Sequence, residues 1–414
     1  MGINAIPGCL RAVSLSLHSF VFRRKDTTEA GITDMLNYQL EVLLSGEHPE
    51  IDFATGKPFK CKKKATLAKT LLADGFRCAF SAWTGDLKEK VAVHRFSRKY
   101  NSNFLCERCL CNKALASANP WDFRRSSSWW HMKTTPLQYL QTHKGSARSP
   151  WSKVRGWSPL RNKNDNLHGI WLGFGKDVAA SLMLDLASSA QGPDMELNDA
   201  LFHMWLDFIK FWGERGLNVS SIPIFTQTTL SWKCHADYPV LENKMKASKA
   251  KLVFIWAAAK ASAEPQVGPD ADYIRVRAAM AWSLCNYVQI SDRHGLLVSQ
   301  EAAALLRTRG LQFLDTYQYL ATMAYHAGVC RYKYRPKLHY FAHDLDELVV
   351  WRENPRRLEL NAAEDHIGVV KRVARNCHKR TVSSRVAERR SLFLSARCFA
   401  SKVRKRMFVK KVYR

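Results

Sequence analysis

The chain has 414 residues, and 46% of them are hydrophobic, which is normal for a protein with a packed core. It carries 64 Lys and Arg against 36 Asp and Glu, a formal net charge of +28. This composition excludes a wholly disordered chain, and the charge favours polyanions, above all nucleic acid, as partners. More than half of the excess lies in 331–414, where 23 basic residues face 8 acidic ones.

The first 25 residues contain four basic residues and no acid before Asp26. Such a composition resembles an organellar transit peptide, which would place the protein in a mitochondrion or plastid. The alternative is that the alternating segment 12–22 is a strand that enters the fold. No apolar run reaches the roughly 18 residues that a membrane helix needs, so we expect no membrane span.

Next along the chain, the hydrophobic pattern predicts a helix over 28–44 and a short helix over 65–73. The apolar run 76–83 has the length of a strand and ends just before Asp86. Segment 112–161 is rich in Ser, Trp, Pro and basic residues, and we expect little regular structure in it.

Helical periodicity returns after residue 167. The predicted helices cover 177–188, 197–215, 241–263, 273–292 and 299–326. A further periodic stretch begins at Glu364, and a basic tail, 401–414, closes the chain.

Two short motifs lie far apart in the sequence. Cys106 and Cys109 form a Cys-x-x-Cys, and His339 and His343 form a His-x-x-x-His. Together they offer the ligands of a closed Cys2His2 zinc site. The alternative is an incidental cysteine pair in a reducing compartment, and Cys111 is either a substitute ligand or a bystander.

Two acidic residues have settings that suit metal-dependent phosphoryl transfer. Asp86 follows the predicted strand, and Glu364 begins a predicted helix. Enzymes with an RNase H-like fold hold two divalent metals with such acids, and carboxylate oxygens suit Mg²⁺. Taken singly, each is a weak signal, and an ordinary surface acid is the simpler interpretation.

The order of these motifs resembles the catalytic domain of CACTA-class DNA transposases and of their relative, the V(D)J recombinase. The resemblance covers roughly 76–390. It depends on Gly85-Asp86, Cys106-x-x-Cys109, Asp165-x-x-His168, His339-x-x-x-His343 and Glu364 in this order. It implies an α/β fold in which a partial RNase H-like core is interrupted by a large, mainly helical insertion.

The resemblance also implies roles for these residues. Asp86 and Glu364 would be the second and third catalytic acids and would hold Mg²⁺, while the two Cys and two His would bind structural Zn²⁺ and clamp the ends of the insertion together. Asp165 and His168 would be structural or lie near DNA.

The first catalytic aspartate of the family has no convincing counterpart. Asp26 follows a strand-like segment, Asp34 lies in a predicted helix and Asp52 in a predicted loop. Without that acid one metal site loses a ligand, so we expect an N-terminally truncated, inactive descendant of a DDE transposase. No separate N-terminal DNA-binding domain is evident either.

These observations predict four segments. They are 1–111, the N-terminal part of the core without its first strand; 112–335, the Trp-rich basic stretch and helical insertion; 336–400, the C-terminal part of the core; and 401–414, the basic tail.

The leading hypothesis is a nuclear, transposase-derived protein that binds DNA but is catalytically defective, with a homodimer as a further candidate assembly. The alternatives are an active Mg²⁺-dependent transposase or nuclease, and a noncatalytic basic nucleic-acid-binding protein, for instance in an organelle. Stacking of the tryptophans on bases and packing of the same rings in the core are both open. The candidate nucleic-acid contacts are Trp151, Lys153, Arg155, Lys371, Arg372 and Arg375.

Overall fold

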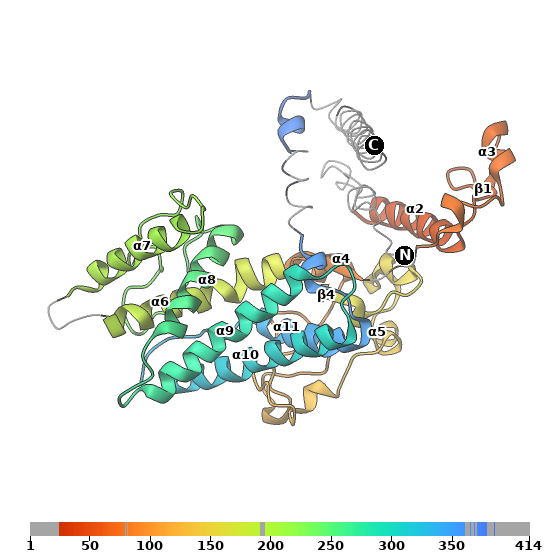
Figure 1. Cartoon of the computed structure of the whole chain (residues 1–414). Helices are drawn as coiled ribbons and strands as arrows, with labels where there is room; N and C mark the ends of the chain where they lie inside the picture. The colour runs from red at the N-terminus through yellow and green to blue at the C-terminus, as the bar shows by residue number, and fades with distance from the viewer. Residues whose placement is uncertain are drawn as a thin grey trace. The chain divides into compact units, whose positions relative to one another are not determined.

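The computed structural model describes residues 25–78, 80, 82–190, 195–360, 365, 368, 371–378 and 385 (Figure 1). The chain divides into two compact units. One comprises Leu40–Glu50 and Pro58–Leu360, and the other comprises Met1–Gln39, Ile51–Lys57 and Asn361–Arg414. The fold is mixed and dominated by helices, with two small two-stranded sheets.

The first described element is α2 (Lys25–Ser45), which confirms the helix predicted over 28–44. Strands β1 (Ile51–Asp52) and β2 (Lys57–Pro58) form a small sheet, and the helix α3 (Lys62–Leu67) follows. The short helix expected over 65–73 therefore begins and ends earlier than predicted. A left-handed backbone at Lys69, with φ of 62°, fits this early end.

The second sheet brings two distant segments together. Strand β3 (Trp83–Gly85) runs parallel to β4 (Asn162–Asn164), with Gly85 opposite Asn164. The strand expected over 76–83 is thus much shorter and lies later, and the described residues of 76–82 are not in a strand. The side chain of Phe76 is 63% exposed, so the apolar run is not a continuous buried strand.

Asp86 lies at the end of β3, as predicted, and begins helix α4 (Leu87–His94). Its carboxylate accepts a hydrogen bond from the Leu87 N–H at 2.8 Å, which satisfies one free donor at the helix start. Segment 112–161 holds only α5 (Pro136–Thr142) and several 3₁₀ turns, so the expectation of sparse regular structure is confirmed.

The helical body agrees closely with the predicted helices. Only one start differs by more than two residues, because 241–246 precedes its helix as an irregular segment in which Leu241 and Met245 are buried. These helices are α6 (Gly175–Ala190), α7 (Leu197–Gly213), α8 (Ala247–Ala263), α9 (Ala271–Arg293) and α10 (Gln300–His326). A sixth helix, α11 (Pro336–Trp351), was not among the predicted ones.

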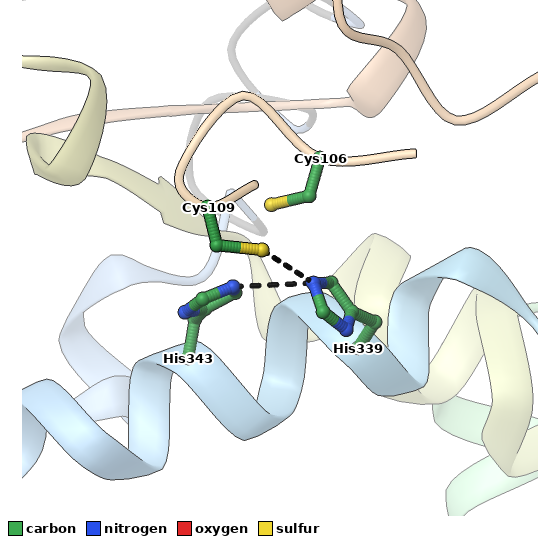
Figure 2. Close-up of side chains that lie close together, drawn as sticks. All are labelled: Cys106, Cys109, His339 and His343. Carbon is green, nitrogen blue, oxygen red and sulfur yellow. Dashed lines mark hydrogen bonds between the residues drawn. The ribbon is translucent and has the colours of Figure 1, made fainter. Parts of the chain in front are cut away.

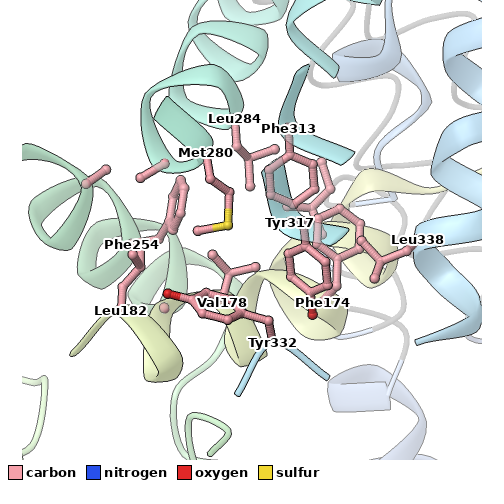
Figure 3. Close-up of a cluster of buried hydrophobic side chains, with 14 of the residues drawn as sticks. Phe174, Val178, Leu182, Phe254, Met280, Leu284, Phe313, Tyr317, Tyr332 and Leu338 are labelled. Carbon is pink, nitrogen blue, oxygen red and sulfur yellow. The ribbon is translucent and has the colours of Figure 1, made fainter. Parts of the chain in front are cut away.

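One hydrophobic core joins these helices (Figure 3). Within it, the buried Phe174 stacks against Phe313 of α10 with ring centroids 5.5 Å apart, and Leu338 brings α11 into the same core. Helices α10 and α11 approach closely at Gly310, where an added Cβ would lie 2.2 Å from a Leu345 methyl group. Packing of these apolar faces, about 25 cal/mol for each Å² buried, supplies most of the stability and fixes the position of α11.

None of the described helices is long and apolar enough to span a bilayer. In the stretch predicted to be helical from Glu364, the described residues Asp365, Gly368 and 371–375 are helical. Glu364 itself, segment 12–22 and the tail 401–414 lie outside the described residues.

Candidate metal centre

Helix α11 positions the two histidines. Pro336 occupies its first turn, where the missing N–H costs nothing. His339 and His343 are four residues apart, so both lie on one face of the helix, and both are completely buried. The sequence therefore presents two imidazoles side by side from one rigid element.

The two cysteines lie in a buried loop outside regular structure. The Arg108 N–H donates to Cys106 Sγ at 3.3 Å, and the Arg98 guanidinium donates to the carbonyl oxygens of Cys106 and Cys111 at 2.8 and 2.6 Å. Cys109 forms an antiparallel bridge with Lys133. These contacts hold both thiols in place without help from a helix or a long strand.

The two halves of the predicted zinc site meet (Figure 2). Cys109 Sγ lies 3.3 Å from His339 Nε2, and His343 Nε2 lies 3.2 Å from the same atom. With Cys106, the four ligand atoms all lie within 4.8 Å of one another. A tetrahedral Zn²⁺ with two sulfur and two nitrogen ligands needs separations of about 3.3 to 3.8 Å. The cluster is therefore able to hold a metal ion such as zinc.

The surroundings orient the imidazoles. His339 Nδ1 lies 3.1 Å from the carbonyl oxygen of Pro120, a contact that leaves Nε2 free to face the cysteines. The Trp129 ring packs against His339 with centroids 4.3 Å apart and excludes water. On the other side, Lys133 Nζ lies 3.1 Å from His343 Nδ1 and 3.1 Å from Asp346.

The electrostatics favour a thiolate in the cluster. Burial opposes ionisation of Cys106, but hydrogen bonds with Cys109, His339 and His343 hold its pKa well below the usual value. Burial lowers the pKa of His343 to about 3, so that its imidazole stays neutral. Cys106 and His343 thus take the forms that bind metal. Burial raises the pKa of Cys109, and the neighbouring cysteines outweigh burial to raise that of His339 to about 9, so metal binding would displace a proton from each of these two ligands.

Ionic contacts that sequence reasoning missed join the same two segments. Arg108, between the two cysteines, is fully buried and lies 2.6 Å from both Asp344 and Glu347 on α11. Lys163 of β4 also forms an ion pair with Glu347. The available signal was the opposite charge placed directly beside the two motifs.

Asp165 and His168 form a structural unit. The Asp165 carboxylate accepts the N–H groups of Leu167, His168 and Leu360 and lies 2.5 Å from His168 Nδ1. Its oxygens are thus occupied by the turn that follows β4. Because Asp86 follows the neighbouring strand β3, the two acids lie at the same edge of the small sheet.

Asp86 is half-buried and lines a cavity of about 630 Å³. Glu364, the acid predicted to act with Asp86, lies outside the described residues. Among the described residues, the group of potential metal ligands is the Cys2His2 set, which does not include Asp86. The Mg²⁺ site predicted with Asp86 and Glu364 stays a prediction.

The basic stretch near Trp151 has a mixed environment. The half-buried Trp151 ring packs edge to face on Trp83 with centroids 4.5 Å apart, and Trp157 is buried in the same small cluster. Packing in the core, one of the two alternatives, therefore describes both rings. Lys153 and Arg155 are exposed, and Arg155 pairs with Glu41 at 2.9 Å.

The other predicted contacts, Lys371, Arg372 and Arg375, are exposed and lie in the helical stretch 371–375. Comparison with known proteins gave no further assignment. No protein-family model, curated protein or solved structure matches this chain.

Proposed function

We propose that the chain is a zinc-stabilised DNA-binding protein descended from a DDE transposase, and that it holds DNA without cutting it. The convergence of Cys109 and His339, 230 positions apart, carries this proposal. A chance order of motifs gives no reason for distant cysteines and histidines to share one buried point. Convergence is what the resemblance to the transposase catalytic domain implies.

The metal in this proposal is zinc in a structural role. Two thiols and two imidazoles within 4.8 Å of one another suit Zn²⁺ better than the oxygen-preferring Mg²⁺ or Ca²⁺. All four ligands come from the protein and are buried, which leaves no open position for a substrate. The ion would join the loop that carries Cys106 and Cys109 to helix α11.

The charge of the chain supports DNA as the partner. A net charge of +28 attracts the phosphate backbone at any sequence. Because Trp151 and Trp157 pack in a small core, the contact would depend on exposed basic side chains and not on base stacking. Lys371, Arg372 and Arg375 are three exposed basic residues within five positions.

The environment of Asp86 supports the proposal that the protein does not cut DNA. Its carboxylate caps α4, and the described residues place no further acid with it in a group of metal ligands. Two-metal cleavage needs several such ligands around the scissile phosphate.

Binding is tested by fluorescence anisotropy with two unrelated duplexes that have 5′-hydroxyl ends. We expect similar affinities for both and a steep linear fall of the logarithm of the binding constant with the logarithm of salt concentration. Replacing Lys371, Arg372 and Arg375 by Ala should reduce the slope by up to about 0.9 for each lost phosphate contact. Absent or salt-insensitive duplex binding would overturn the proposal.

A further inference from the structure

A cavity of about 630 Å³ lies in the larger unit. Its wall includes the start of α4, the start of α6, the start of α11 and the loop that precedes α8. The volume is within the usual range for a small-molecule site. Its charged lining residues are Asp86, Lys88, Lys176, Glu242, Arg335 and Lys337.

Two of these lysines point their ammonium groups at backbone carbonyls. Lys176 is buried and donates to the Glu242 carbonyl oxygen at 3.0 Å, and the half-buried Lys337 donates to the His168 carbonyl oxygen at 2.6 Å. In the part of the chain that the structure describes, neither forms an ion pair with a carboxylate. Asp86 and Asp165 act on Lys337, and Asp177 and Glu242 act on Lys176, only from beyond ion-pair distance. Each positive charge is therefore only partly compensated where it is withdrawn from water, which is costly for the protein alone.

The balance of charge in the cavity is positive. Arg335 is neutralised by Asp177, which it contacts with two hydrogen bonds of 2.9 and 2.7 Å. The three lysines then face two carboxylates, those of Asp86 and Glu242. Burial lowers the pKa of both Lys176 and Lys337, and the nearby carboxylates do not fully offset it.

The backbone is shaped to bring Lys337 into this position. Gly173 lies at an irregular point before α6, and a Cβ there would lie 2.6 Å from Lys337 Cδ and 2.7 Å from the His168 carbonyl oxygen. Only glycine allows the lysine stem to lie flat against this turn. Such an irregular turn beside a helix is common at functional sites.

We propose that this cavity binds a phosphorylated nucleotide unit, with the phosphate held by Lys176 and Lys337. Charged donors that lack a carboxylate partner suit phosphate oxygens. Asp86 and Glu242 offer acceptors for the hydroxyl or amino groups of the same unit, and Tyr100 adds an aromatic wall. The inference rests on the proposed function, and it adds that the chain takes a single nucleotide, either free or at the end of a strand.

The test uses the full chain and a short single-stranded oligonucleotide labelled at its 3′ end, prepared with either a 5′-phosphate or a 5′-hydroxyl. Deoxyadenosine 5′-monophosphate and inorganic phosphate serve as competitors. We expect tighter binding of the 5′-phosphorylated strand if a strand end is the ligand, and direct binding of the monophosphate if a free nucleotide is. Both results support the proposal and identify the source of the phosphate.

Three variants localise the effect. Lys337→Met and Lys176→Met should weaken phosphate-dependent binding about tenfold or more, the loss expected for one hydrogen bond to a charged group. Lys88→Met, at an exposed position on the rim, tests the cavity without risk to the fold, and we expect a smaller loss. Lys210→Met on α7 is the matched control, because this lysine is exposed and is not part of the cavity lining.

The outcomes separate this inference from the proposed function. Equal affinity for the phosphorylated and hydroxyl strands, together with no binding of the monophosphate, overturns the cavity proposal even if the 5′-hydroxyl duplexes bind. Binding of the monophosphate without duplex binding would retain the cavity and reject the DNA-binding function. Equal losses of phosphate-dependent affinity in Lys210→Met and Lys337→Met would also reject the cavity as the binding site.

Discussion

Arg108 and Asp344 are 236 positions apart in the sequence, yet Nη1 of the arginine lies 2.6 Å from Oδ1 of the aspartate. Arg108 stands between the two cysteines of the candidate metal centre, and Asp344 follows the second histidine. This ion pair therefore connects the same two segments as the four metal ligands. The segments are held together by the metal site, which needs the ion, and by the ion pair, which does not.

Arg108→Met should destabilise the protein by roughly 3 to 5 kcal/mol, because it leaves Asp344 without its buried ion-pair partner and Glu347 with Lys163 alone. Urea denaturation with zinc present measures the change in the free energy of unfolding. Arg124→Met is the control: Arg124 pairs with Asp122 at 2.8 Å, but its side chain is 75% exposed. Its loss should cost less than about 1 kcal/mol. Equal losses in the two variants would contradict a structural role for the buried pair.

The free energy of unfolding should decrease as the pH falls, because of His94. Burial and the nearby charge of Lys90 lower the pKa of His94 to about 3 in the folded protein, from an ordinary value of 6.5. Between these values the unfolded chain binds the proton more strongly. Stability is therefore full above pH 6.5 and falls as the pH drops towards 3, by up to about 1.4 kcal/mol per pH unit.

His94→Phe isolates this contribution, because every other titrating group remains. Denaturation of both proteins at pH 7 and pH 5.5 should show a smaller loss of stability in the variant. Identical pH dependence in the two proteins would mean that His94 is protonated in the folded state as easily as in the unfolded chain.

Asp86→Ala should cost about 1 kcal/mol of stability, because the helix cap on α4 is lost. It should leave the outcome of a nicking assay unchanged. We expect neither the parent nor the variant to nick supercoiled DNA in the presence of Mg²⁺. Nicking by the parent that disappears in Asp86→Ala would show an active nuclease and reject the noncatalytic proposal.

Gly173→Ala should displace Lys337, because the new methyl group would lie 2.6 Å from its side chain and 2.7 Å from a backbone oxygen. We expect a loss of stability of about 1 to 3 kcal/mol, typical of overpacking, and a loss of phosphate-dependent binding. Gly213→Ala is the matched control, since nothing lies within 4 Å of its added Cβ. Equal unfolding temperatures of the two variants would contradict the close approach of Lys337 to Gly173.

The helical body could be predicted from the sequence because its elements are long and periodic. The predicted helix 299–326, for example, agrees with α10 within one residue at its start. The strand 76–83 was wrong because apolar composition does not reveal exposure: Phe76 faces solvent, and pairing is limited to Trp83–Gly85. Pairing partners of so short a strand lie outside any local pattern.

The candidate site was predictable in one part only. The four ligands come from motifs whose spacing is informative, and the resemblance implied that they meet. The partners of Arg108 and Lys337 could not be assigned, because they come from distant segments that only the fold brings together. For Arg108 the sequence offered opposite charges beside the two motifs as a signal, but no pairing. The transposase ancestry, the Mg²⁺ site and the four-segment division stay predictions.

Zinc content of the purified protein, measured by atomic emission after dialysis, tests the central claim most directly. We predict one zinc ion per chain in the parent and in Cys111→Ser, whose thiol is buried but outside the group of four. Cys109→Ser and His343→Ala should lose the ion and unfold at a lower temperature. A parent protein without zinc, or a Cys109→Ser variant that keeps its full content, would contradict the account.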